Sequence, residues 1–399
     1  MKHPQRAVIL PFMTMLGSMV VVPAIRPALA ASGAGEGAMH AFMSVNMLGA
    51  AVGAPLLSWL ADRRRAHREI AIALAVLDAL LIAATTFPIP VWAILLTRTL
   101  QGAANVGLLS ILMAMATRGE GAAPPSHARL GATGAVMTAA IAIGPPLGGV
   151  LLGLGPRTPF FAAALLDGAV GSLLVLAPAA AKLASRAPRP RLELSKNPLL
   201  AVPLVMAFTE RFTVGCFVVS FAVYAHESLG LSDRATSLRF TLFVVPFALA
   251  MFPMWRAAER FSRARTLAWG GVGYGVAFLL LAVTRGPALD LSLVLCGVSS
   301  AMMFAPSLCY AGALSPSESR ATSMGLFNAA GCLGMMFGPA VAGILSATLR
   351  SSGYDAGVRY PIVFAVAGSV QLMAMLLLRR RLRALGEREA DILGPEVAP

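Results

Sequence analysis

The sequence predicts an all-α membrane protein whose twelve transmembrane helices form two pseudo-symmetric bundles of six. The first observation is composition: apolar residues make up 57% of the 399 residues and charged residues 13%, about half the charge of an average soluble domain. The second is distribution, because the apolar residues fall in blocks long enough to cross a bilayer, with short polar breaks between them. The third is an internal repeat that relates landmarks in the two halves at an offset of 194 residues.

Glycine and proline define this repeat. The stretch Gly144–Gly149 reads Gly-Pro-Pro-Leu-Gly-Gly inside a long apolar run. A soluble helix would not tolerate it, whereas in lipid the neighbouring helices satisfy the freed backbone groups and small residues let helices approach closely. The spacing from Gly131 to Gly144 recurs from Gly325 to Gly338. The predicted helix-kink positions are Gly131, Gly144, Pro145, Gly148, Gly149, Gly325, Gly334, Gly338 and Pro339. Close helix contacts are also predicted at Gly49/Gly53 and Gly271/Gly275, which are four residues apart.

In chain order, the apolar blocks predict twelve spans of about 20 residues or more, enough to cross a bilayer. They cover residues 7–30, 39–60, 69–87, 90–115, 131–154, 159–181, 200–225, 236–256, 266–284, 289–314, 321–348 and 358–378. They divide the chain into a first bundle over 1–181, a linker over 182–199, a second bundle over 200–379 and a tail over 380–399. The first block, with Ala28-Leu29-Ala30 at its end, also resembles a cleavable signal peptide. Its removal would leave the first half one helix short of the second, so we expect it to be retained.

Positive charge alternates between the polar segments. Segments on one side of the membrane hold 23 lysines and arginines and those on the other hold five, and the positive-inside rule places the richer side, with both termini, in the cytoplasm. We therefore attribute the net charge of +14 to topology in a multi-pass protein of the bacterial cytoplasmic membrane, surrounded by the lipid bilayer, and expect no nucleic-acid partner. Four arginines fall inside the spans: Arg26, Arg98, Arg211 and Arg239.

The loop after the second span places a carboxylate and a dense basic turn at a helix end. It reads Leu-Ala-Asp-Arg-Arg-Arg over residues 60–65. Its aspartate, Asp62, can pair with arginines or favour the N-terminus of a neighbouring helix. The matching loop of the second half has Glu259 and Arg260 where the first has Asp62 and Arg63. Such a contact can form in one conformation and break in another, so these four residues are predicted to form a conformational gate.

These loops resemble the Gly-x-Leu-Ala-Asp-Arg-x-Gly-Arg-Arg signature of the Major Facilitator Superfamily, with Ser58 and Arg65 in the two glycine positions. Residues 98–105 resemble the family's Arg-x-x-Gln-Gly motif, and residues 144–149 resemble the fifth-helix motif of its drug:proton antiporter branch. The resemblance implies the family's fold of two six-helix bundles, with the third and sixth helices of each bundle on the outside. It implies a monomer that exports small amphipathic compounds or drugs by alternating access, without a cofactor and with the proton gradient as energy source.

Polar and ionisable side chains inside the spans each need a reason, because a charge in lipid costs at least a few kcal/mol. Arg98, Gln101 and Asn105 share one face of the fourth span. We expect them to take part in proton relay or to line the substrate cavity, with a purely structural pairing as the alternative.

Three carboxylates join these candidates for proton coupling or substrate binding. Glu210 and Arg211 are adjacent in the seventh span and point about 100° apart, so we do not expect them simply to pair with each other. Either Glu210 titrates during transport or the two form fixed ion pairs between the halves. Asp78 in the third span and Asp167 in the sixth either bind a proton or bond a neighbouring helix.

Other function classes lack their motifs in the sequence. It has no phosphate-binding Gly-Lys-Ser/Thr loop, so we do not expect ATP to drive the protein directly. It has no metal-binding cluster: the four cysteines lie in apolar blocks, and the five histidines lie at ends or in loops. A metabolite uptake carrier of the same fold, either a proton symporter or a uniporter, is the alternative to export. A membrane-embedded enzyme or sensor is the least expected class.

Overall fold

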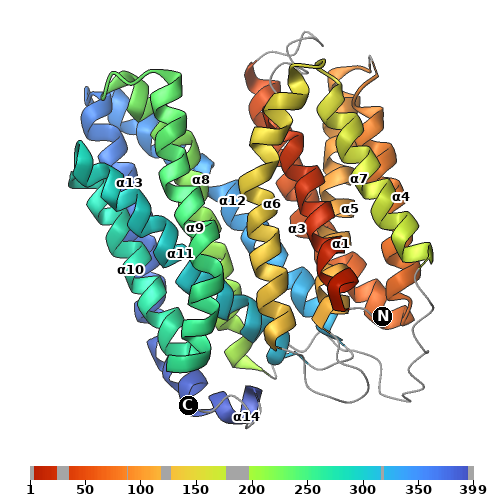
Figure 1. The fold of residues 1–399 in the computed structure, drawn as a ribbon. Helices are drawn as coiled ribbons and strands as arrows, with labels where there is room; N and C mark the ends of the chain where they lie inside the picture. The colour runs from red at the N-terminus through yellow and green to blue at the C-terminus, as the bar shows by residue number, and fades with distance from the viewer. Residues whose placement is uncertain are drawn as a thin grey trace. The chain divides into compact units, whose positions relative to one another are not determined.

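The computed structural model describes residues 4–24, 36–87, 89–117, 127–176, 197–315 and 319–393. Within them, twelve long α-helices follow one another along the chain without a strand (Figure 1). They are α1 (Pro4–Val20), α3 (Glu36–Arg64), α4 (His67–Ala84), α5 (Val91–Thr117), α6 (His127–Leu152), α7 (Thr158–Leu176), α8 (Ala201–Glu227), α9 (Asp233–Phe261), α10 (Arg263–Val283), α11 (Pro287–Ala313), α12 (Arg320–Ser351) and α13 (Ala356–Glu387). The short helices are η1 (Val22–Ala24), η3 (Pro198–Leu200) and α14 (Glu389–Leu393).

The twelve long helices coincide with the twelve predicted spans, so the all-helical membrane fold is confirmed. Among the described residues, ten helices are long and apolar enough to cross a membrane, and residues 8–24 form a shorter apolar one. The first helix is shorter than predicted: α1 ends at Val20 and a turn of 3-10 helix follows, in which Pro23 has no N–H to continue an α-helix. The predicted intramembrane Arg26 and the linker residues 182–196 lie outside the described residues.

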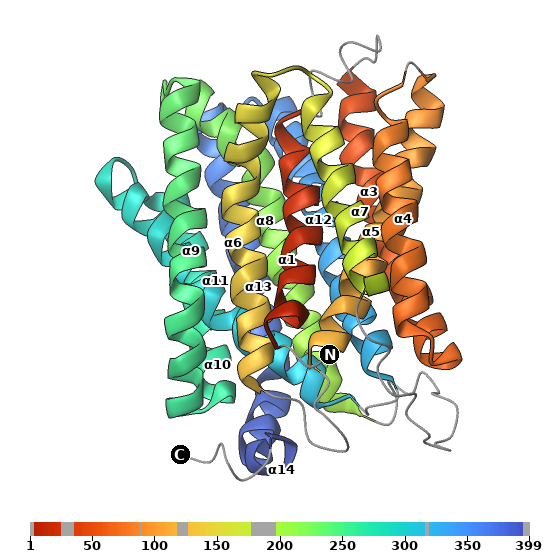
Figure 2. The ribbon, with the colours of Figure 1, turned by 45° about the vertical axis from the view of Figure 1, so that its right-hand side comes forward.

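The chain divides into two compact units. The first comprises residues 1–193 and 315–329, and the second comprises residues 194–314 and 330–399. Helix α12 therefore contributes its first turns to the first unit and the rest to the second. In the first unit, α4 packs on both α5 and α7, and the two views agree on this placement (Figure 2).

Glycines set the closest helix contacts of the first unit. A Cβ built on Gly49 would lie 1.9 Å from the Thr99 carbonyl oxygen, and one built on Gly102 would lie 2.0 Å from the Asn46 carbonyl oxygen. Helices α3 and α5 therefore touch backbone to backbone, as the four-residue glycine spacing predicts. The α1–α6 contact is built in the same way: a Cβ on Gly144 would lie 2.2 Å from that of Met19.

The repeat reappears in the second unit, where α12 packs on α8. A Cβ on Gly334 would lie 2.2 Å from the Phe208 carbonyl oxygen, and one on Gly338 would lie 2.3 Å from that of Phe212. Gly144 and Gly338, which correspond at the 194-residue offset, thus serve equivalent helix pairs in the two units.

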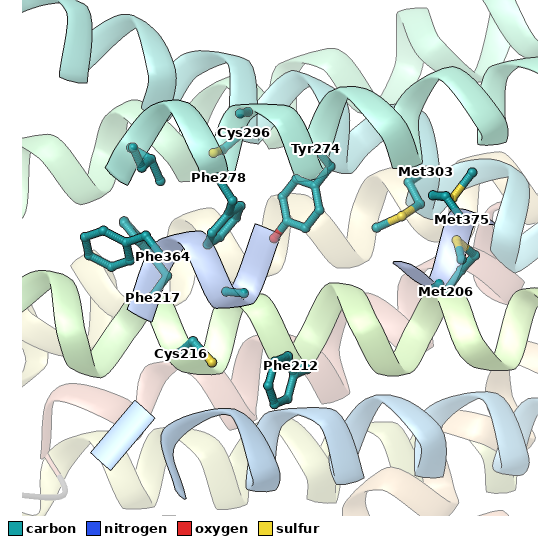
Figure 3. Close-up of a cluster of buried hydrophobic side chains, with 14 of the residues drawn as sticks. Met206, Phe212, Cys216, Phe217, Tyr274, Phe278, Cys296, Met303, Phe364 and Met375 are labelled. Atoms are coloured by element: carbon teal, nitrogen blue, oxygen red, sulfur yellow. The ribbon is translucent and has the colours of Figure 1, made fainter. Parts of the chain in front are cut away.

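The second unit is also held by an aromatic cluster (Figure 3). The Phe217 ring centroid lies 4.8 Å from that of Phe221 and 5.4 Å from that of Phe243. Figure 3 shows Met206, Met303 and Met375 gathered at the other end of the same buried cluster. These methionines therefore pack in a helix-bundle core, where an unbranched thioether fills irregular gaps.

Two helix ends are fixed by specific hydrogen bonds. Helix α3 ends in a Schellman motif, in which the Ala66 N–H donates to the Ala61 oxygen and the Arg65 N–H to the Asp62 oxygen, both at 3.2 Å. Arg65 occupies its left-handed position at φ 52°, the place that glycine holds in the family signature. Helix α13 runs beyond the predicted end of its span to Glu387, and Glu389 then accepts hydrogen bonds at the start of α10.

Candidate functional site

Arg98, Gln101 and Asn105 lie on one buried face of α5, as predicted. The Arg98 guanidinium donates through Nη1 to Gln101 Oε1 and stacks over the Phe42 ring, 4.8 Å from its centroid. Asn46 of α3 donates to the same Gln101 Oε1 at 2.9 Å and to the Arg98 carbonyl oxygen at 3.2 Å. The close approach of α3 to α5 at Gly102 is what brings the Asn46 amide within reach.

Asp78 of α4 accepts hydrogen bonds from two amides of this network. Gln101 Nε2 donates to its Oδ1 at 2.7 Å and Asn105 Nδ2 donates to its Oδ2 at 2.5 Å. Asn105 in turn accepts a hydrogen bond from the Ser18 hydroxyl of α1 at 2.7 Å. A continuous chain of polar groups therefore joins α1, α3, α4 and α5 within the first unit. It runs from Arg98 through Gln101, Asp78 and Asn105 to the half-buried Ser18.

Asp167 of α7 lies against this chain and is also fully buried. Its carboxyl group is within hydrogen-bonding reach of Asp78. Among the described residues, no N–H or O–H group donates to either of its oxygens. The structure thus brings five of the predicted residues into one cluster: Arg98, Gln101, Asn105, Asp78 and Asp167.

Glu210 and Arg211 belong to the second unit, and one expectation about them is wrong. Arg211 Nε donates directly to Glu210 Oε2 at 2.9 Å, because the long arginine stem folds back across the angle between adjacent helical positions. The second Glu210 oxygen accepts from the Ser300 hydroxyl of α11 at 3.1 Å. The Arg211 guanidinium also lies over the Phe304 ring at 5.5 Å. Glu210 is therefore buried and doubly hydrogen-bonded within one unit.

Asp62, in the last turn of α3, binds the N-terminus of α12. Its Oδ2 accepts from the Thr322 backbone N–H at 2.7 Å and from the Thr322 hydroxyl at 2.6 Å, and its Oδ1 lies 2.7 Å from His67 Nε2. A carboxylate in this place satisfies unpaired N–H groups and meets the positive end of the helix dipole. Asp62 and Thr322 both belong to the first unit.

The other predicted gate residues differ from Asp62. Arg63 is exposed and stacks over the Trp59 ring at 4.8 Å. Arg260 is exposed on the last turn of α9, and the side chain of Glu259 lies outside the described part of the chain.

The predicted kink glycines also separate into two kinds. Gly148 makes a backbone contact with α1, where an added Cβ would lie 2.1 Å from the Val20 oxygen, and Gly325 contacts α3. Gly149 has nothing within 4 Å of an added Cβ. The helices run unbroken through Pro145 and Pro339, and the backbone of Gly131 lies within α6.

Several residues of these networks were missed from the sequence. Asn46, Ser18, Thr322 and Ser300 are common polar residues in apolar helices, and the sequence holds no signal that would single them out. His67 did have a signal, since it follows Asp62 by five residues and can reach back across the turn. Among the described residues, no group of three or more histidine, cysteine or acidic side chains could hold a metal ion.

Comparison with models of protein families gives a match that covers nearly the whole chain. A family model described as the Major Facilitator Superfamily matches residues 7–224 and again residues 203–394. A search of curated proteins found no significant match.

Solved structures share the fold at low sequence identity. The human organic anion transporter MFSD10 (TETRAN) has a TM-score of 0.72 and 16% identity, over 94% of this chain and 99% of its own. The proton:xylose symporter XylE bound to 6-bromo-6-deoxy-D-glucose gives 0.72 and 16%, over 96% and 98%. A double tryptophan variant of XylE gives 0.76 and 16%, over 95% of each chain. At this identity the likeness establishes the fold alone.

Proposed function

The chain belongs to the Major Facilitator Superfamily, whose fold is that of secondary transporters, and on this premise we propose that it exports small amphipathic compounds in exchange for protons by alternating access. The observation that carries the proposal is the buried polar cluster of the first unit. It places an arginine and two carboxylates among apolar helices, where charge is costly and is retained mainly for function.

The cluster suits proton coupling better than simple cross-linking of helices. A structural ion pair would bring the guanidinium directly onto a carboxylate. Here the amide of Gln101 stands between them, since it accepts from Arg98 and donates to Asp78. A change of charge among the carboxyl groups at the Asp78 end of this chain is therefore felt by Arg98 through polarisable hydrogen bonds.

Asp62 supplies the conformational gate in this proposal. It holds the first turn of α12, a helix that continues into the second unit. Breaking the two hydrogen bonds to Thr322 would weaken the hold on that end of α12 while the glycine contacts farther along the helix remain. In our proposal the contact forms in one access state and is lost in the other.

Export rather than uptake is proposed from the Gly-Pro-Pro stretch of α6, which resembles the antiporter branch. The alternative is a proton-coupled uptake carrier, which is favoured by the fold shared with a structure described as a proton:xylose symporter. In either case we propose that the protein acts as a monomer, needs no cofactor, and lies in the bacterial cytoplasmic membrane with both termini in the cytoplasm.

Reconstitution into proteoliposomes tests the proposal. With the purified protein, an imposed pH gradient should drive ethidium, or another amphipathic cationic dye, against its own gradient and opposite to the proton flow. Movement of the compound in the same direction as the protons would favour the uptake carrier. Transport that ignores the pH gradient for every compound of a panel of dyes, organic anions and sugars would refute proton coupling.

Two variants test the residues that carry the mechanism. Arg98→Ala and Asp62→Asn should fold but lose gradient-driven transport, because the first removes the cation of the buried cluster and the second weakens the hold on α12. Arg64→Ala is the matched control, because Arg64 is exposed, carries the same charge as Arg98 and lies two residues from Asp62. Wild-type rates in both variants would remove these residues from the mechanism.

A further inference from the structure

Two fully buried carboxyl groups meet in the first unit, and they differ in their partners. Each oxygen of Asp78 accepts a hydrogen bond from an amide, one from Gln101 and one from Asn105. The direction of the first is fixed, because Gln101 Oε1 is already taken by two donors, Arg98 Nη1 and Asn46 Nδ2. Its Nε2 must therefore face Asp78. The two oxygens of Asp78 are thus arranged as those of an ionised carboxylate.

Asp167 has the opposite surroundings. Neither of its oxygens receives a donor from the described residues. On the α1 side, a Cβ built on Gly17 would lie 3.6 Å from Asp167 Oδ2, so the carboxyl group faces a bare stretch of backbone. An ionised carboxylate without a donor is expensive at such a site. Asp167 nonetheless lies within hydrogen-bonding reach of Asp78, and two ionised carboxylates have only acceptors to offer each other.

We propose that Asp78 and Asp167 share one proton, which is carried on Asp167 and donated to Asp78, and that this pair is the proton-binding site of the transport cycle. The second part rests on the proposed function, and the first does not. With the proton in place, the cluster holds one negative charge on Asp78 and one positive charge on Arg98. A metal cation would fit poorly here, because the oxygens of Asp78 are occupied by N–H groups.

Arg98 is the charged group that faces the pair from α5. From the other helices packed around it, α1 presents Gly17 and Ser18 and α3 presents Asn46. Helix α6 carries its ionisable residues in its first turn. Whether Asp167 carries the proton therefore depends on its interaction with the Asp78–Gln101–Arg98 chain.

Release of the proton gives this site a role in the cycle. The Asp167 O–H bond breaks, its electron pair stays on the carboxylate, and the proton passes to water; rebinding reverses the step. After release, two carboxylates face one arginine, and no group in the described part of the chain donates to Asp167. This state favours a rearrangement that admits water or a donor to α7, so that occupancy by the proton shifts the balance of conformations.

Infrared spectroscopy tests the shared proton independently of transport. Full-length protein with isotope-labelled aspartate, reconstituted in lipid at neutral pH, should show the C=O band of a protonated aspartic acid. The band should be lost in Asp167→Asn, whose amide can still donate to Asp78. It should persist in Asp355→Asn, because Asp355 is an exposed N-cap of α13 and asparagine caps a helix equally well. A wild-type spectrum without the band, or a band that survives in Asp167→Asn, overturns the shared proton.

Transport measurements test its coupling role. Asp167→Asn should keep dye exchange between the two sides of the membrane but lose dye accumulation driven by a pH gradient. Accumulation at the wild-type rate overturns that role even if the band behaves as expected. If the wild type itself shows the band but no gradient-driven transport of any compound, the shared proton stands and the proposed function fails. The wild-type spectrum decides the first part even where a variant does not fold.

Discussion

Replacing Gly338 by alanine tests whether α12 and α8 touch backbone to backbone at this glycine rather than packing through side chains. In α12, a Cβ at this position would lie 2.3 Å from the Phe212 oxygen and 2.9 Å from the Cys216 nitrogen. Both atoms are backbone atoms of α8, so no side chain can turn aside to make room. Helix α12 would have to move away from α8 by about an ångström, since an ordinary carbon–oxygen contact is near 3.4 Å.

The cost follows from comparison with a second glycine of the same helix. Forcing a methyl group into a packed site costs about 1–3 kcal/mol. Alanine also gains up to about 1 kcal/mol over glycine in helix propensity. Gly343→Ala carries the same propensity gain without the clash, because an added Cβ there has nothing within 4 Å. The difference in unfolding free energy between the two variants should therefore be about 1–3 kcal/mol.

Thermal unfolding followed with a thiol-reactive dye measures this difference. All four cysteines are buried and belong to the second unit, and Cys216 donates to the Gly338 oxygen at 3.2 Å. The Tm of Gly338→Ala, measured by cysteine labelling, should therefore be several degrees below that of Gly343→Ala. The Tm of Gly343→Ala should match or exceed that of the wild type. Equal Tm values for the two variants would refute the view that α8 and α12 touch backbone to backbone.

Two further predictions concern the turn that ends α3. In a double-mutant cycle of Asp62→Ala and Thr322→Val, Tm and unfolding free energies should give a coupling of about 0.5–3 kcal/mol, since the two residues share a hydrogen bond to a charged group; additive losses would contradict the contact. Arg65→Gly should raise stability by about 1 kcal/mol, because Arg65 holds a left-handed conformation that costs about 1–2 kcal/mol for residues with a side chain. A lower Tm for Arg65→Gly would show that the arginine side chain contributes more than the strain removes.

The spans were predictable because the solvent defines them. A helix that crosses lipid must be apolar over a fixed length, so hydropathy alone located all twelve long helices, most of them to within a few residues at each end. The clear failure is the end of α1, which lies at Val20 and is followed by a turn of 3-10 helix that contains Pro23, although the apolar run continues. The glycine pairs were predictable for a related reason, since close approach of two backbones excludes a side chain.

The partners of the polar residues were not predictable. Asp62 and Thr322 are 260 positions apart in the chain, and nothing in either neighbourhood points to the other. Glu210 shows the reverse error: its neighbour in the sequence was expected to point elsewhere, yet the flexible Arg211 side chain folds back to it. Helix geometry constrains Cβ directions but not the reach of a long side chain.

The sequence by itself determined that this chain spans a membrane as two related bundles, and it marked the costly residues inside them. Only the tertiary structure decided which of those residues meet. Asp78 and Asp167 stand on helices far apart in the chain, and the packing of α4 against α7 brings their carboxyl groups together, where none of the described residues donates a hydrogen bond to Asp167. Hydropathy is a local property that each segment carries alone, whereas a shared proton requires two segments to be placed side by side.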